Sequence, residues 1–141
     1  MTVQSSPPIE LDVRVPVWGR VHTVAPLVLV GTREPDGSFD LAPKHLALPL
    51  GLQDWFGFVC TPRHSTYTNA QRERAFTVSY PQPSQLVLTS LAASPRSEDG
   101  SKPAVHALPT VPARRIAGVL VEGASLALEC EFERVVEGFG E

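Results

Sequence analysis

The segment Cys60–Tyr80 holds the residues of this chain that are best suited to chemistry. It reads CTPRHSTYTNAQRERAFTVSY, with cationic and hydroxyl side chains between two strand-like ends. A helix that begins near Ser65 would present free N–H groups and a partial positive charge at its N-terminus. The hydroxyl groups of Ser65 and Thr66 add donors at that end. Arg63 and His64 add positive charge, since a guanidinium binds phosphate through two parallel hydrogen bonds. The sequence therefore predicts a cradle for a monophosphate.

The same segment also fits a purely structural interpretation. Ser65 or Thr66 would cap a short helix that runs to about Arg74. Thr68 and Gln71 have the spacing of a capping box. The arginines of the helix would then lie solvated on its outer face. Residue spacing alone does not separate this interpretation from the phosphate cradle.

No catalytic motif accompanies the predicted cradle. The chain contains neither GxxxxGK nor GxGxxG, which argues against ATP and against a Rossmann-bound dinucleotide. It has no GxSxG motif and no metal-ligand spacing, and its four histidines lie on separate segments: His22, His45, His64 and His106. A phosphate cradle without an acid, a base or a nucleophile indicates that a bound cofactor carries the reaction. We therefore assign no catalytic side chain and no metal.

The composition is that of one globular domain. The 141 residues are 43% hydrophobic and 19% charged, which is enough to bury a continuous core. The net charge of -3 argues against a general nucleic-acid binder, and no apolar run approaches the roughly 20 residues of a membrane-spanning helix. Met1–Glu10 has neither the basic start nor the apolar stretch of a secretory signal. Cys60 and Cys130 lie in separate apolar runs, which predicts buried free thiols and a cytoplasmic protein.

Hydrophobic patterning predicts a mainly β fold with inserted helices. We expect a short edge strand over residues 13–17 and longer strands over Val24–Thr32, Trp55–Cys60, Ala75–Tyr80, Ile116–Val121 and Ser125–Val135. The strands over 24–32 and 55–60 are expected to share one sheet. Residues 44–51 should be irregular, helices should run to about residue 74 and over 84–93, and residues 94–112 should form a polar surface excursion of the kind that often covers a site. Strands and helices do not alternate regularly, so a β-barrel is favoured over a doubly wound sheet.

The alternation is clearest in the last of these strands. One face carries Leu126, Leu128, Cys130 and Phe132, and the other carries glutamates that we expect to be solvated: Glu129, Glu131 and Glu133. Gly138 and Gly140 then predict a turn, and a partner strand for that turn does not follow. The single domain, 1–141, is expected either to close without that strand or to lack its C-terminal strands.

Three stretches resemble the flavin reductase-like family in the order found in that family. They are APLVLVGTREPDGSFDLAPKHL, WFGFVCTPRHSTYTNAQRERAFTVSYP and GASLALECEFERVVEGFG, and the resemblance spans about 24–140. In the first stretch Gly37 matches a family glycine turn, and the following Leu41, Ala42 and Pro43 match its Leu-Ala-Pro centre. Asp40 stands where the family usually has Asn, and His45 where it usually has Ser.

The second and third stretches add further matches. Thr66 and Asn69 match a Thr-x-x-Asn pattern before a short strand, and Cys130 lies in the LEC of a late strand. The resemblance implies the FMN-binding split barrel, a mainly β barrel of Greek-key type with inserted helices. It also implies a homodimer with each flavin near the subunit interface.

The resemblance further implies where FMN would bind. The loop from Asp40 to His45 would border the flavin ring and ribityl chain, the segment Thr61–Asn69 would hold the 5′-phosphate, and Thr32 and Cys60 would lie near the ring. The cofactor-binding residues expected on these grounds are Thr32, Asp40, Leu41, Ala42, Pro43, His45, Cys60, Thr61, Arg63, His64, Ser65, Thr66 and Asn69.

Three functions follow as hypotheses. The first, implied by the resemblance, is an oxidoreductase that passes hydride from NAD(P)H to FMN and feeds reduced flavin to a partner monooxygenase. The second is a flavin-binding carrier or sensor without turnover, which Asp40 and His45 favour because they depart from the family pattern. The third is a nucleic-acid-binding domain that uses Arg63, Arg72 and Arg74, against which the acidic net charge argues.

Overall fold

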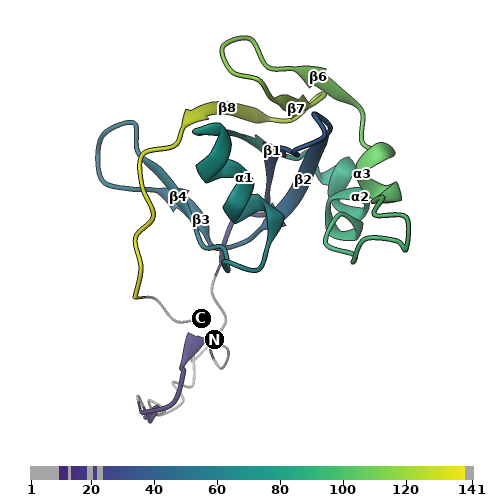
Figure 1. Ribbon diagram of the computed structural model, residues 1–141. Coiled ribbons are helices and arrows are strands. Elements are labelled where there is room, and N and C mark those ends of the chain that lie inside the picture. The colour runs from purple at the N-terminus through teal and green to yellow at the C-terminus, as the bar shows by residue number, and fades with distance from the viewer. Residues whose placement is uncertain (1–9, 13, 19–20, 22–23, 139–141) are drawn as a thin grey trace, which may run out of the picture.

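The computed structural model of the chain describes residues 10–12, 14–18, 21 and 24–138. Its strands are β1 (Val28–Arg33), β2 (Phe39–Lys44), β3 (Ala47–Pro49), β4 (Phe56–Phe58), β5 (Ala75–Tyr80), β6 (Thr110–Pro112), β7 (Val119–Val121) and β8 (Leu126–Glu131). Its helices are α1 (Ser65–Glu73), the 3-10 turn η2 (Pro83–Gln85), α2 (Leu86–Leu91) and α3 (Pro103–His106). The fold is mainly β with helices inserted in the middle of the chain, as predicted (Figure 1).

A four-stranded antiparallel sheet in the order β2-β1-β5-β8 forms the centre of the fold. Val30 of β1 lies opposite Ala42 of β2 on one side and Val78 of β5 on the other. β1 and β2 are joined by the predicted tight turn, in which Gly37 has a φ of 88° and its N–H donates to the Glu34 carbonyl at 3.0 Å. A residue with a Cβ would be strained at that φ, so the glycine fixes the register of the hairpin.

Alternation along these strands gives the sheet two apolar faces. Val28, Val30 and Val78 pack with Ala70 of α1 and with the β3–β4 hairpin on the first face. The second face carries a separate cluster, formed by Leu29, Leu41, Ala92, Val105, Leu108 and Val121 from β1, β2, β7 and the α2–α3 region. The sheet is therefore covered on both sides, which explains why β1 is buried along almost its whole length.

The β6–β7 hairpin lies against the second face through close polar contacts. The Thr77 hydroxyl donates to the Val119 carbonyl at 2.6 Å, and the Val121 N–H donates to the Ser79 hydroxyl at 3.0 Å. A Cβ on Gly31 would stand 2.2 Å from Thr77 Oγ1 and 3.1 Å from the Val119 carbonyl oxygen. Glycine at that position is what allows β7 to approach β1 so closely.

Two predictions about the β3–β4 region are wrong. Residues 44–51 are not irregular, since β2 runs through Lys44 and Ala47–Pro49 forms β3. The strand predicted over 55–60 is short, and it pairs with β3 in a hairpin of its own instead of joining the sheet of β1. A pattern of alternation shows that a strand exists but carries no information on its partner, which is settled by long-range packing.

The outer segments also differ from the prediction. Residue 13 lies outside the described residues, and 14–18 form no strand there. β1 begins at Val28, because the preceding Val24 is 95% exposed and has no sheet to pack against. The excursion 94–112 contains α3 and β6, and its Val105 and Leu108 are buried in the second apolar cluster. It is therefore part of the core as well as surface.

The capping prediction for α1 is wrong in its detail. His64 occupies the N-cap position with no side-chain capping bond, and Ser65 and Thr66 lie inside the first turn. Thr68 donates instead to the Ser65 carbonyl at 3.1 Å. The helix ends at Arg74, whose φ of 55° turns the chain directly into β5, the strand whose predicted bounds are confirmed.

Glu129 is the exception to the prediction that the glutamates of β8 are merely solvated. Its carboxylate accepts hydrogen bonds from the N–H groups of Arg114 at 3.0 Å, Arg115 at 2.7 Å and Ile116 at 3.2 Å. It thus anchors the turn between β6 and β7 to the edge strand of the sheet. These bonds, the one from Arg114 first, lower the pKa of Glu129.

We predict that Glu129→Gln lowers the melting temperature at pH 7 by a few degrees. Because the pKa of Glu129 is lower in the folded protein, the Glu129 carboxylate stabilises the fold at pH values above the ordinary glutamate pKa. This stabilisation is lost as the pH falls through the pKa of the folded protein. The difference from wild type should therefore shrink under acid conditions, as measured by circular dichroism melts from pH 7 to pH 3. Glu131→Gln, which alters an exposed carboxylate of the same strand, is the matched control, and equal effects of both changes at pH 7 would contradict the anchor.

Candidate functional site

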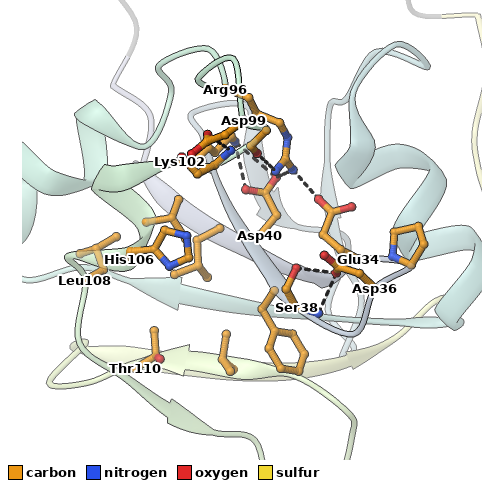
Figure 2. A pocket seen from close by; sticks show the side chains of 17 residues that line it. Glu34, Asp36, Ser38, Asp40, Arg96, Asp99, Lys102, His106, Leu108 and Thr110 are labelled. Carbon is orange, nitrogen blue, oxygen red and sulfur yellow. Dashed lines mark hydrogen bonds and ion pairs between the residues drawn. The ribbon is translucent and has the colours of Figure 1, made fainter.

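The carboxylate of Asp40 lies where β2, α1 and the excursion 94–112 meet. Asp40 is 3% exposed, and its Oδ1 lies 3.0 Å from Lys102 Nζ. Its Oδ2 lies 3.6 Å from Arg96 Nη2 and accepts a hydrogen bond from the Ser65 hydroxyl at 3.4 Å. Figure 2 shows the carboxylate flanked by the two cations of the excursion. The negative charge that Asp40 brings in place of an asparagine is therefore balanced within the protein.

A cavity of about 650 Å³ opens beside this carboxylate, beneath the excursion. Its apolar lining comes from the second face of the sheet and from the segment that covers it: Phe39, Leu41, Val105, Leu108 and Val119. Figure 2 shows polar side chains around it, among them the carboxylates of Glu34, Asp36 and Asp99 and the imidazole of His106. Cavities of this size accommodate a small ligand or one ring system of a larger one.

The N-terminus of α1 is open, with no side chain capping it. His64 has extended backbone angles and makes no side-chain cap, and no acidic residue lies in the first turn. The first N–H groups of an α-helix have no partner within the helix, so they are available to an anion. The Thr61 carbonyl accepts the His64 N–H at 3.1 Å, which shapes the turn that leads into the helix. Arg63 and His64 are exposed on that turn.

Thr66 and Asn69 lie on the buried face of α1, each with 1% of its surface exposed. Asn69 Nδ2 donates to the Thr32 hydroxyl at 3.3 Å, and its Oδ1 accepts from Arg72 Nη1 at 2.9 Å. Arg72 also donates to the Arg33 carbonyl. These bonds hold α1 on β1 and so fix where the helix N-terminus lies.

The remaining residues expected at the site are divided between two faces. Leu41 packs in the apolar cluster on the second face, away from α1. Ala42 is buried and Pro43 is half-buried, while His45 is exposed just after β2 ends. The structure thus gathers Asp40, Cys60, Thr61, Arg63, His64 and Ser65 around the start of α1, and leaves Thr32, Thr66 and Asn69 to support the helix.

Three cations near the site escape the sequence reasoning. Lys44 is 9% exposed and donates from Nζ to Cys60 Sγ at 3.4 Å, while Lys102 and Arg96 bind Asp40. Reading residues 39–44 as a strand would have placed Asp40 and Lys44 on one face, since they are four residues apart. No local signal marks Arg96 or Lys102, because the excursion has no periodic pattern.

The described residues contain no group of three or more histidine, cysteine or acidic side chains that could hold a metal ion. None of the helices in the described part of the chain is long and apolar enough to cross a bilayer.

The fold is that of a small mainly β protein in which the open N-terminus of a helix lies close to a buried carboxylate and a cavity. The family model for the flavin reductase like domain matches residues 20–141, and the chain belongs to this family. None of the curated proteins compared with the chain is significantly similar to it.

Several solved structures share the fold, which is that of the flavin reductase-like split barrels. Nitrilotriacetate monooxygenase component B from Bacillus cereus superposes with a TM-score of 0.80 at 16% identity, over 97% of this chain and 74% of that one. The FMN-binding protein from Thermus thermophilus superposes with a TM-score of 0.77 at 20% identity, over 94% of this chain and 72% of that one. Flavoredoxin of Desulfovibrio vulgaris (Miyazaki F) superposes with a TM-score of 0.76 at 21% identity, over 92% of this chain and 69% of that one. The chain also spans 57% of the length of the 2-nitrobenzoate 2-nitroreductase of Pseudomonas fluorescens.

We predict that Lys102→Met lowers the free energy of unfolding by about 1–3 kcal/mol, because it deprives a buried carboxylate of its nearest cation. Asp40→Asn in the same background should restore most of that loss, since a neutral amide does not need the cation. Urea denaturation of the two single variants and the double variant measures the coupling. If the two losses simply add, the ion pair does not organise the site.

Proposed function

We propose that the protein binds FMN and acts as an oxidoreductase that passes hydride from NAD(P)H to flavin. The observation that carries the proposal is the open, uncapped N-terminus of α1, which lies in a flavin reductase-like chain beside a cavity large enough for a ring system. The donor set fits a monophosphate: Arg63, His64 and the free N–H groups of the first helical turn, which begins at Ser65.

FMN, when bound, would supply the two-electron redox chemistry, and the chain would supply position and surroundings. Arg63 and the backbone N–H groups of the first helical turn would hold the phosphate, while Asn69 holds the helix against β1. The excursion 94–112, pinned through Asp40, would exclude water from one side. No side-chain acid or base is required for hydride transfer, which agrees with the lack of a catalytic motif in the sequence.

The alternative is a flavin-binding carrier or sensor without turnover. Asp40 favours it, because the carboxylate is already bound by Lys102, Arg96 and Ser65 and has no N–H to donate to a flavin. FMN binding without consumption of NAD(P)H would select this function. The nucleic-acid hypothesis loses support, since Arg72 is bound to Glu73 and the Arg33 carbonyl, and Arg74 lies over the Phe132 ring.

We further propose that the protein is a homodimer. The β3–β4 hairpin, here residues 46–59, exposes about half or more of six large apolar side chains: Leu46, Leu48, Leu50, Leu52, Trp55 and Val59. Such a patch marks an interaction site in many proteins. Reduced flavin would be delivered to a partner monooxygenase, as the name of the Bacillus cereus component B suggests for that protein. The two free cysteines favour a reducing compartment such as the cytoplasm.

The function is tested by titrating purified protein with FMN and recording flavin absorption and fluorescence. We predict FMN binding at micromolar concentration and FMN-dependent oxidation of NADH or NADPH. Arg63→Ala should weaken FMN about tenfold or more while leaving riboflavin almost unchanged, because only FMN carries the phosphate. Arg114→Ala, which removes an exposed arginine of the β6–β7 turn, is the control. A protein that ignores FMN defeats the proposal, and equal losses for FMN and riboflavin contradict the cradle.

The dimer is tested by sedimentation velocity at micromolar concentrations. We predict that Leu48→Glu converts a dimer to a monomer, because it buries an unpaired charge in the apolar patch of the hairpin. Val87→Glu, at an exposed valine of α2, should leave the dimer intact. A wild-type monomer, or equal dissociation in both variants, would rule out this interface.

A further inference from the structure

The side chain of Lys44 is largely buried and pairs with no carboxylate of the described residues. Lys44 is 9% exposed at the end of β2, and no carboxylate of the described residues forms an ion pair with it. The nearest carboxylate on the same face of β2, that of Asp40, is bound by Lys102 and Arg96. Among the described residues, the only side-chain hydrogen-bond partner of Lys44 is the Cys60 sulfur, which lies 3.4 Å from Nζ. The Lys44 ammonium is therefore directed at the Cys60 sulfur, where a positive charge stabilises the developing charges of a reaction at sulfur.

Other groups with positive character lie close to the Cys60 sulfur. His64 Nδ1 lies 4.0 Å from Sγ, at the N-cap of α1, where the helix contributes partial positive charge. The Cys60 thiol donates to the Thr61 carbonyl at 3.7 Å. Cys60 is half-buried, so a small reagent can reach it. Cationic, partly exposed surroundings of this kind are those of reactive cysteines.

We propose that Cys60 is a nucleophilic cysteine, activated by Lys44, and a site of oxidation by hydroperoxides. The sulfur attacks one peroxide oxygen, an S–O bond forms and the O–O bond breaks. The sulfur loses two electrons to the peroxide, whose second oxygen leaves as hydroxide or alkoxide and takes up a proton. The product is a sulfenic acid, which thiols reverse through a disulfide. The proposal does not depend on FMN.

The other cysteine of the chain is an internal control. Cys130 lies in β8, packed against the first apolar cluster, and burial raises the pKa of Cys130 to about 11. It therefore stays a thiol at neutral pH and should react slowly with the same reagents. Because both cysteines belong to one molecule, their relative labelling is independent of reagent concentration and of the amount of folded protein.

The test treats the folded, flavin-free protein at pH 7 with hydrogen peroxide and a dimedone probe, or with iodoacetamide, and follows each cysteine by peptide mass spectrometry. We expect Cys60 to react about tenfold or more faster than Cys130. Lys44→Met, which keeps the length and removes the charge, should slow Cys60 about tenfold without changing the rate of Cys130. Lys44→Arg, which keeps the charge, should restore a rate close to wild type.

Circular dichroism melts accompany each variant, and labelling in guanidinium chloride gives the rates of the unfolded chain, at which the two cysteines should be nearly equal. Lys44→Gln serves in place of Lys44→Met if the latter does not fold. Equal rates for the two cysteines in the folded protein overturn the proposal, as does a Cys60 rate that is unchanged when a folded variant lacks the Lys44 charge.

Discussion

The buried carboxylate of Asp40 ties together the three parts of the chain that surround the site. It receives Lys102 and Arg96 from the excursion and the Ser65 hydroxyl from the first turn of α1. A carboxylate with 3% exposure is tolerated only where such partners compensate it, so strand, helix and excursion are constrained to one arrangement. The same ion pairs hold the excursion over the edge of β2, where its apolar residues close the second face of the sheet.

The two faces of the central sheet hold different parts of the region around Asp40. The first face carries α1 and the β3–β4 hairpin, and it positions a helix whose first turn has no side-chain cap and no acidic residue of its own. The second face carries the β6–β7 hairpin and the excursion, and it forms the apolar wall of the cavity. β2 takes part in both, because Asp40 and Lys44 point to the helix side while Leu41 points to the other. A ligand that reached from the helix end to the cavity would follow this strand.

Charge balance distinguishes this site from the pattern of its family. An acidic residue at position 40 would repel a flavin phosphate if it stood alone, and its two cations remove that repulsion. Lys44, on the same strand as Asp40, is a third cation in this region, and its ammonium contacts the Cys60 sulfur instead of a carboxylate. The region around the start of α1 thus combines a buried carboxylate paired with two cations, a cysteine in contact with a lysine, and an exposed arginine. Its electrostatics depend on side chains that come from three separate segments.

Local patterns in the sequence were enough for α1, for β5 and for the hairpin turn at Gly37, because helix and strand periods and the φ of a turn glycine are properties of neighbouring residues. The family motifs also indicated the split barrel. Pairing was decided by the tertiary structure: β4 joins β3, Glu129 binds the 114–116 turn, and Lys102 reaches Asp40 across 62 positions. These contacts depend on which faces meet when the sheet closes, and no local pattern encodes that. The contact between Lys44 and Cys60 could not be predicted for the same reason, since only the fold brings the end of β2 next to the turn before α1.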